Sequence, residues 1–269
     1  HRLTPPAPHT RGLIPAAGHL PSPGKPPLPS RPMPPTDLSL QIQLHPFPDG
    51  DAVAQALAQA VADDLRTALA LRGQASIALS GGTTPRRFLQ ALSRQPLDWA
   101  NVTVTLVDER WVDDRHERSN ARLVKEHLLQ DAAADARFVP LYRPAASPDE
   151  VLADVAAALP ATLDVVVLGM GGVGHTASFF PGGDRLADAM DPATTATVLP
   201  MRAPGAGEPR ITLTLPVLRD AGRLYLHIEG GEKRQVLQQA LSGQGAGAGY
   251  PVRAVLQALR APLQVYLTQ

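Results

Sequence analysis

The chain has 269 residues, of which 44% are hydrophobic and 19% charged, with a formal net charge of zero. This composition is typical of a soluble globular protein and gives no bulk attraction to nucleic acid or to an anionic membrane. The absence of cysteine excludes disulfides, thiol nucleophiles and thiolate metal sites, and it fits a reducing cytoplasm. No apolar run approaches the roughly 18 residues that span a bilayer, and no signal-peptide core is visible. We therefore expect a cytoplasmic protein with neither nucleic-acid nor membrane partners.

Residues 1–37 differ from everything that follows, because prolines recur throughout them without any apolar periodicity. This pattern predicts a disordered, extended segment, and a proline-motif ligand for a partner domain is the alternative. The chain begins with His1, and Met33 lies just before the ordered pattern. We expect the natural start near Met33 and a single domain over residues 38–269.

From Ser39 onward, apolar periodicity predicts strands that alternate with helices. In residues 50–71 apolar side chains recur at helical spacing, with Asp49 or Asp51 as the expected N-cap. The predicted strands are 39–44, 75–79, 102–107, 165–168, 198–200, 210–213, 223–228 and 263–267. The predicted helices are 50–71, 85–92, 119–129, 151–159, 215–221, one that begins near 230 and runs through 241, and 252–259, with a flexible loop at 243–249. This order predicts an α/β fold with a mostly parallel sheet covered by helices on both faces.

Three of the predicted strands end in polar or glycine-rich clusters, namely Ser80–Thr84, Asp108–Arg110 and Gly169–Ser178. The carboxyl ends of parallel strands share one edge of a sheet, so these clusters are expected to converge on a ligand site.

Two kinds of group in and near these clusters suit a phosphate. The turn Ser80–Thr83 precedes a helix, where backbone amides and hydroxyls could bind phosphate or sugar oxygens, although such a turn is as often a plain connection. It lacks the Walker and Gly-x-Gly-x-x-Gly patterns. Arg110 could bind a phosphate in bidentate fashion. Lys233 and Arg210 follow or precede strands and are either phosphate ligands or ordinary surface cations.

His175 follows four glycines within six residues, at positions 169, 171, 172 and 174. Its unperturbed pKa lies near physiological pH, so it is the best candidate general base, the alternative being a glycine turn with an incidental histidine. The other histidines show no metal-ligand spacing, and no Gly-x-Ser-x-Gly motif occurs, so neither a metal nor a serine nucleophile is expected.

Five segments in order resemble the glucosamine-6-phosphate isomerase/6-phosphogluconolactonase family, and two of them resemble its lactonase branch. The segments are Leu79–Pro85, Asp108–Val112 with Ser119-Asn120, Gly169–Pro181, Arg210–Pro216 and Gly230–Lys233. The resemblance implies a Rossmann-like fold, no cofactor, and hydrolysis of 6-phospho-D-glucono-1,5-lactone with His175 as general base. The substrate-binding residues it implies are Ser80, Gly81, Gly82, Thr83, Asp108, Arg110, Asn120, Gly171, Gly174, Arg210 and Lys233.

One position departs from the family pattern, because Val173 stands where the family usually has an aspartate two residues before the histidine. That aspartate could orient the imidazole, and Asp108 or Glu109 is the candidate substitute here. The alternatives are a non-catalytic sugar-phosphate-binding protein and an amino-sugar-phosphate deaminase or isomerase of the same fold. We expect a small-molecule sugar phosphate as the partner and a monomer or weak homodimer.

Overall fold

The computed structural model describes residues 36–269, so the predictions for residues 1–35, including the start near Met33, lie outside it. The first described residues are already hydrogen-bonded to the C-terminal part of the chain. The buried Arg253 donates from Nη2 to the carbonyl O of Thr36 at 2.7 Å, and the Leu38 N–H donates to the carbonyl O of Leu241 at 3.0 Å. Both partners belong to the C-terminal helices α7 (Gly231–Ser242) and α8 (Pro251–Ala258).

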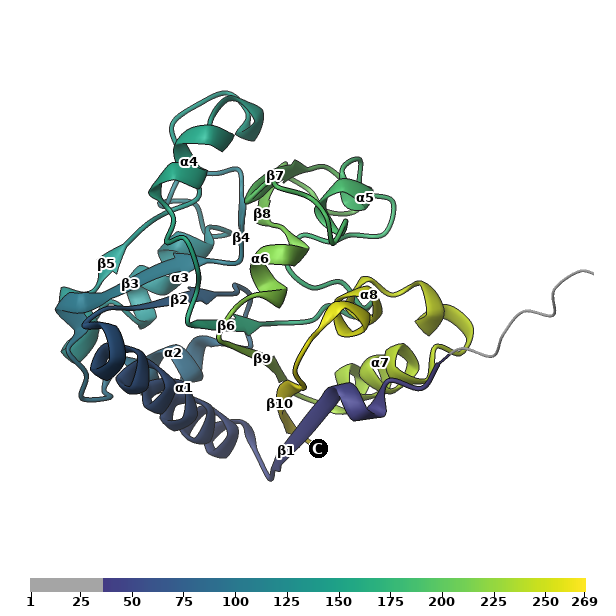
Figure 1. Cartoon of the computed structure of the whole chain (residues 1–269), viewed down its shortest axis with the longest axis horizontal. Coiled ribbons are helices and arrows are strands. Elements are labelled where there is room, and N and C mark those ends of the chain that lie inside the picture. Colours follow the sequence, from purple (N-terminus) through teal and green to yellow (C-terminus); the bar gives the residue numbers. More distant parts are fainter. Residues whose placement is uncertain (1–35) are drawn as a thin grey trace, which may run out of the picture. The chain divides into compact units, whose positions relative to one another are not determined.

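The large sheet is parallel throughout its recorded pairings, as the strand–helix alternation predicts (Figure 1). Every residue of the central strands β2 (Ala75–Leu79) and β6 (Val165–Leu168) is buried, which explains their continuous apolar sequence. The strands are, in spatial order, β1 (Ile42–Phe47), β10 (Leu263–Thr268), β9 (Arg223–Ile228), β6 (Val165–Leu168), β2 (Ala75–Leu79), β3 (Val102–Leu106) and β5 (Arg137–Phe138).

Helices lie on both sides of this sheet. The long helix α1 (Gly50–Arg72) packs against β2 and β10 and beside α2 (Arg86–Ser93). Figure 1 shows α6 (Leu215–Arg219) on the other side of the sheet. Besides α7 and α8, the helices are α1 (Gly50–Arg72), α2 (Arg86–Ser93), α3 (Asn120–His127), α4 (Leu152–Ala158), α5 (Leu186–Ala189) and α6 (Leu215–Arg219). The short 3-10 helices are Ser39–Gln41, Trp99–Asn101, Asp131–Asp135, Pro148–Glu150 and Gly245–Gly249.

The long helix α1 shows how local sequence signals set an element. Asp49 caps it by accepting from the Ala52 N–H at 2.8 Å, and Gly73 ends it in the left-handed conformation with φ of 72°. The apolar residues at helical spacing are fully buried, at positions 53, 57, 61 and 65. Each fully buried aliphatic side chain contributes about 1.5–3 kcal/mol, so this face fastens α1 to the sheet.

A second, antiparallel sheet was not predicted. It contains β4 (Asp108–Arg110), β8 (Arg210–Leu213) and β7 (Val198–Met201) in the order β4-β8-β7. The residues after β3, expected to be only a polar cluster, thus form a strand of their own. The register places Arg110 opposite Arg210 and Asp108 opposite Thr212. Two guanidinium groups a hundred residues apart in sequence are thereby brought together.

Two further predictions were wrong near the ends of the domain. The first strand was expected at residues 39–44, but residues 39–41 form a 3-10 helix because the Asp37 carboxylate accepts from the Ser39 N–H at 2.9 Å and from its hydroxyl at 2.6 Å. The strand then runs to Phe47 at the edge of the sheet, where Pro46 is tolerated. Residues 245–249, expected as a loop, form a 3-10 helix whose Gly247 packs against the backbone of α7.

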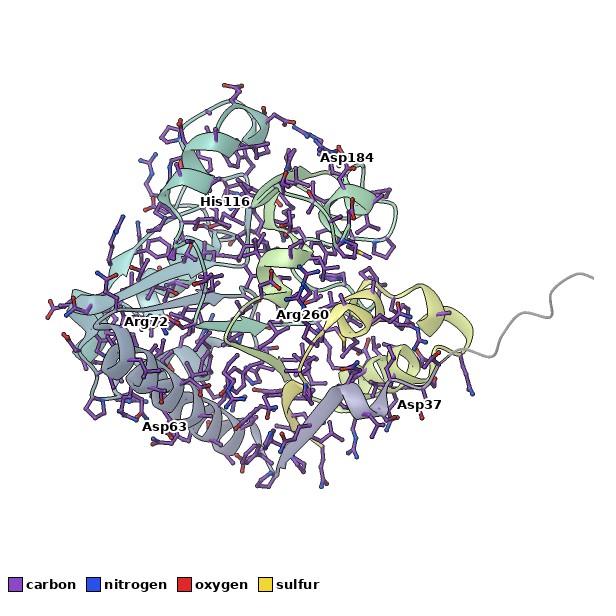
Figure 2. The ribbon with its side chains drawn as sticks, viewed as in Figure 1. Asp37, Asp63, Arg72, His116, Asp184 and Arg260 are labelled. Atoms are coloured by element: carbon purple, nitrogen blue, oxygen red, sulfur yellow. The ribbon has the colours of Figure 1, made fainter. Side chains whose placement is uncertain are left out.

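Charged side chains gather at the surface, where Asp63 and Asp184 are labelled in Figure 2. The Asp63–Arg66 pair joins exposed groups at 2.6 Å. Such pairs contribute about 0–1 kcal/mol, so the buried apolar core carries the stability of the fold. Within residues 36–269 no helix is long and apolar enough to cross a bilayer, and no cluster of three His, Asp or Glu side chains could hold a metal ion.

Candidate active site

A cavity of about 300 Å³ opens at the carboxyl ends of β2, β6 and β9. Its location is the one expected for a ligand site in an open α/β sheet. The predicted base and every predicted substrate-binding residue line it, with the exception of Gly174. The lining residues among them are Ser80, Gly81, Gly82, Thr83, Asp108, Arg110, Asn120, Gly171, His175, Arg210 and Lys233.

The loop after β6 folds tightly around His175. The Gly171 N–H donates to the His175 carbonyl O at 2.9 Å, and the Gly174 N–H donates to the Gly171 carbonyl O at 3.0 Å. The imidazole lies against the Cα of Gly171, where a Cβ would approach its Cε1 to 1.8 Å. On its other side the ring packs on Phe180, with ring centroids 4.6 Å apart. Glycine at 171 is therefore required by the position of the imidazole.

The surroundings of His175 favour its neutral form. Burial lowers its pKa below 6.5, the negative charge of Asp108 opposes this shift, and the positive charges of Lys233, Arg210 and Arg110 add to it. Its Nδ1 is buried and has no hydrogen-bond partner in the described part of the chain. A neutral imidazole can accept a proton, which is what a general base requires.

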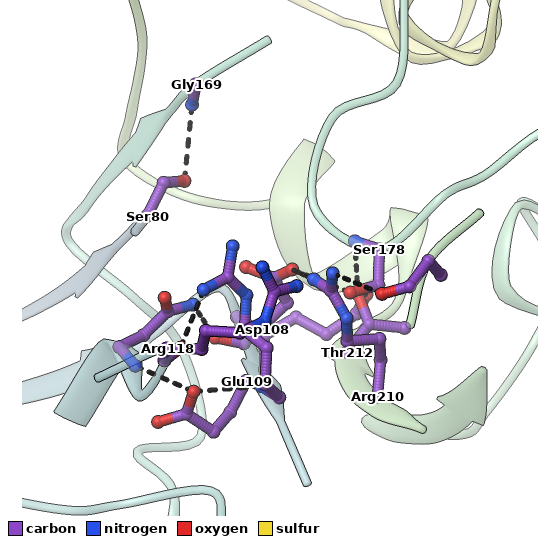
Figure 3. Close-up of polar contacts among 12 residues, drawn as sticks. Ser80, Asp108, Glu109, Arg118, Gly169, Ser178, Arg210 and Thr212 are labelled. Carbon is purple, nitrogen blue, oxygen red and sulfur yellow. Dashed lines mark hydrogen bonds and ion pairs between the residues drawn. The ribbon is translucent and has the colours of Figure 1, made fainter. Parts of the chain in front are cut away.

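Asp108 and Glu109, the candidates for orienting His175, are both engaged elsewhere. Asp108 Oδ2 accepts from the Ser178 hydroxyl at 2.6 Å and lies 3.8 Å from Arg210 Nη1, as Figure 3 shows. Between residues 36 and 269 neither carboxylate hydrogen-bonds the imidazole. Neither candidate therefore orients the imidazole by a direct hydrogen bond, and the charge of Asp108 opposes the lowering of the His175 pKa.

Glu109 instead anchors a helix. It is fully buried, and its carboxylate accepts from the backbone N–H groups of Arg110, Asn120 and Ala121 at 2.8 Å each. Burial raises the pKa of Glu109 to about 7, and the three N–H groups oppose that rise. These bonds fix the N-terminus of α3 beside the cavity, which positions Asn120.

Asn120 in turn supports the glycine turn after β2. Its Nδ2 donates to the Asp108 carbonyl O at 2.9 Å, and its Oδ1 occupies the space that a Cβ on Gly81 would need. Gly82 has φ of 97°, a conformation that side chains disfavour. The Ser80 hydroxyl joins β2 to β6 by donating to the Val167 carbonyl O at 3.0 Å. This turn and the His175 loop are thus held in one framework.

Three cationic side chains line the same cavity. Arg110 Nη1 donates to the Arg118 carbonyl O at 2.6 Å, and Arg210 Nη2 donates to the Ala206 carbonyl O at 2.9 Å. The Nε of both arginines is buried without a partner among the residues that the structure describes. Lys233 Nζ donates to the carbonyl O of Met170. A guanidinium has five N–H donors, so both arginines keep donors for a ligand.

The loop tip lies apart from this cavity. The side chain of Val173 is 55% exposed, and Val173 is not one of the described residues that line the cavity. Gly174, with φ of 71°, packs under the ring of Tyr250, and its carbonyl O accepts from the Val252 N–H at 2.9 Å. Gly174 therefore supports the loop, it is not among the cavity-lining residues, and its contact with a substrate stays a prediction.

Sequence reasoning missed His227 and Glu229, which line the cavity at the end of β9. The rule that linked the other clusters, polar residues at the carboxyl end of a buried strand, also applies to them. Phe88 of α2, which lies within the helix predicted at 85–92, lines the cavity beside His227.

Comparison with known proteins agrees with this geometry. A family model described as Glucosamine-6-phosphate isomerases/6-phosphogluconolactonase matches residues 48–263. The chain is 54% identical over 231 residues to a 6-phosphogluconolactonase of Rhizobium meliloti (strain 1021), across 84% of this chain and 99% of that protein. It is 50% identical over 222 residues to a 6-phosphogluconolactonase of Pseudomonas aeruginosa, across 81% and 92%.

A solved structure is also similar. The crystal structure of a 6-phosphogluconolactonase from Shewanella baltica OS155 has a TM-score of 0.81 at 36% identity, covering 87% of this chain and 100% of that one. The resemblance noted from the motifs is thereby confirmed, and the chain belongs to the glucosamine-6-phosphate isomerase/6-phosphogluconolactonase family.

Proposed function

We propose that this chain hydrolyses 6-phospho-D-glucono-1,5-lactone to 6-phospho-D-gluconate in the oxidative pentose phosphate pathway. The observation that carries the proposal is that His175, a half-buried histidine with a lowered pKa, lines one cavity with Arg110, Arg210 and Lys233. The names of the similar proteins from Rhizobium meliloti and Pseudomonas aeruginosa support this substrate.

The cations supply what the phosphate end of the substrate needs. A phosphate dianion offers only hydrogen-bond acceptors, and buried guanidinium groups bind it in bidentate fashion. Arg110 and Arg210 stand opposite each other in the small sheet, and Lys233 lies at the start of α7. In the proposed complex these three groups hold the phosphate, and the turn Ser80–Thr83 with Asn120 contacts the sugar.

The chemical step is proton transfer by His175. The neutral imidazole takes a proton from water, whose oxygen attacks the lactone carbonyl carbon and forms a tetrahedral oxyanion. The oxyanion collapses, the bond between this carbon and the ring oxygen breaks, and the imidazolium returns the proton to that oxygen. Backbone N–H groups of the glycine loops stabilise the oxyanion in this scheme. Water and side chains suffice, so the scheme needs no cofactor.

A stopped-flow assay with freshly made lactone and a pH indicator tests the proposal, after the spontaneous hydrolysis is subtracted. Enzyme-dependent acid release supports the lactonase. Tight binding of 6-phosphogluconate without acceleration would support the non-catalytic binding protein, the alternative raised by the valine at position 173. Keto-sugar and ammonia production from an amino-sugar phosphate would support the deaminase.

The pH dependence has a sign that follows from His175. Because its pKa is lowered below 6.5, the neutral, active form persists to lower pH than for an unperturbed histidine, and kcat/KM should fall only as the pH drops through that lowered pKa. The measurement is kcat/KM from about pH 5 to pH 8. An acidic limb centred above pH 6.5 would contradict this assignment.

The substitution Val173→Asp tests the departure from the family pattern. From the sequence we expect it to raise kcat/KM, and the 55% exposure of Val173 limits the rise, because a solvated carboxylate stabilises a nearby imidazolium only weakly. A gain of about threefold is expected, within the range of exposed charge pairs. Val173→Asn is the uncharged control. An unchanged or lower kcat/KM for the aspartate variant would count against this prediction.

Three further sequence-based expectations stay predictions. Analytical ultracentrifugation would test the oligomeric state, which is predicted to be a monomer or a weak homodimer. The cytoplasmic location is open to cell fractionation, and the absence of nucleic-acid binding to a gel-shift assay at low salt.

A further inference from the structure

A second group of titratable side chains lines the cavity and has no part in the scheme above. His227 Nε2 lies 3.1 Å from Glu229 Oε1, and Glu229 Oε2 lies 3.2 Å from Arg87 Nη2. Arg87 Nη1 continues to the exposed Asp51 at 3.3 Å. A polar chain thus runs from the surface to the cavity wall, and only its inner pair, His227 and Glu229, lines the cavity.

The inner pair presents hydrogen-bond acceptors. Burial lowers the pKa of His227, the charge of Glu229 opposes this shift, and the ring packs edge-on against Phe88 with centroids 6.1 Å apart. A neutral imidazole has one N–H, and the neighbouring carboxylate selects the tautomer that carries it on Nε2. Nδ1 is then an acceptor, and it is buried without a partner within residues 36–269.

The carboxylate adds to this acceptor character. Each of its oxygens can accept two hydrogen bonds, and His227 and Arg87 account for one on each. The Glu229 side chain is 20% exposed, so it remains accessible from the cavity. The wall at the end of β9 therefore offers acceptors and a negative charge.

The opposite chemistry stands elsewhere in the same cavity, where Arg110, Arg210 and Lys233 offer donors and positive charge. A phosphate is repelled by Glu229 and attracted to the cations, whereas a sugar hydroxyl can donate to Glu229, the accessible member of the pair, which His227 holds in place. Leu168 of β6 pairs with Leu226 of β9, so the loop of His175 and the inner pair follow neighbouring strands.

From this polarity we infer that His227 and Glu229 form an acceptor subsite, which binds a ring hydroxyl of the sugar and directs the phosphate toward the cations. The inference rests on the proposed function for the placement of the phosphate. It assigns a role in substrate specificity to the pair. A lactone that lacks the bound hydroxyl loses the contact with the pair, and a lactone that lacks the phosphate loses the contact with the cations.

The test combines variants with trimmed substrates. His227→Phe keeps a ring beside Phe88 and removes both nitrogens, and Glu229→Gln keeps the shape and removes the charge. Asp51→Asn is the matched control, because it alters the same polar chain at its exposed end. kcat/KM is measured for each on 6-phosphogluconolactone and on analogues that lack the hydroxyl at C2, C3 or C4.

We expect His227→Phe and Glu229→Gln to lower kcat/KM on the full substrate about tenfold or more, as for a hydrogen bond to a charged group. On one of the deoxy analogues their penalty should shrink to about twofold, because the hydroxyl they contact is already missing. Asp51→Asn should stay within about twofold on every lactone. A purely structural role would lower kcat/KM equally on all four lactones, and that result would overturn the inference.

The same comparison is made on dissociation constants of 6-phosphogluconate and its deoxy forms, measured by calorimetry. Binding needs no turnover, so it tests the subsite even if the wild-type chain fails to accelerate lactone hydrolysis. Failure of the proposed function would appear as an inactive wild type. Failure of the inference would appear as equal penalties for all ligands.

Discussion

Replacement of His175 with alanine is expected to lower kcat on 6-phosphogluconolactone by about 10²- to 10⁴-fold, the range that a positioned general base contributes. The His175 side chain lines the same cavity as the three cations, and their charges help to keep its pKa low. Removing it leaves the phosphate-binding groups in place. KM should therefore change much less than kcat, and both are measured by stopped-flow acid release.

His116→Ala is the matched control, because this histidine is exposed and does not line the cavity (Figure 2). It should retain wild-type rates. Calorimetric binding of 6-phosphogluconate to the His175 variant confirms that its cavity is intact. If His175→Ala retained a kcat close to that of His116→Ala, the imidazole would not be the base.

Gly171→Ala is expected to lower kcat/KM by about 10²-fold, because a displacement of the catalytic group by about 1 Å has that effect. The new Cβ would lie 1.8 Å from Cε1 and 2.2 Å from Nδ1 of His175, so the imidazole must move. Phe180 limits where it can go. Gly171 has no positive φ, so the backbone itself accepts alanine and the melting temperature should change little.

Gly172→Ala, one residue further, is the matched control for this prediction. The nearest atom to its added Cβ is Glu232 Oε1 at 3.4 Å, an ordinary contact. It should keep kcat/KM within about threefold of wild type, as surface substitutions usually do. Equal losses for Gly171→Ala and Gly172→Ala would show that loop flexibility, and not the position of the imidazole, controls activity.

The parts of the structure that followed from sequence are those encoded by near neighbours. The helix α1 was readable because its apolar period, the cap at Asp49 and the terminal Gly73 all lie within one segment. The approximate location of the cavity could also be predicted, because polar clusters at the carboxyl ends of parallel strands must share one edge of the sheet. His175 stood out for its glycine loop and for its chemistry.

Other features required knowledge of distant partners. The pairing of β4 with β8 joins segments of three and four residues about a hundred residues apart, and the three residues of β4 carry too little periodicity to be recognised locally as a strand. Glu109 reads in sequence as one charge among several, yet its burial and its three backbone donors make it an anchor for α3. The network of His227 and Glu229 with Arg87 likewise depends on contact between β9 and α2.

The sequence by itself determined the α/β class and the order of most strands and helices, and it supplied the candidates for the base and the cations, since these depend on local periodicity and residue type. Only the tertiary structure decided which charges face one another, which carboxylates are already engaged and which atoms are left to bind a ligand. Those outcomes depend on burial and on pairings between residues far apart in the chain, and neither is encoded in a local pattern.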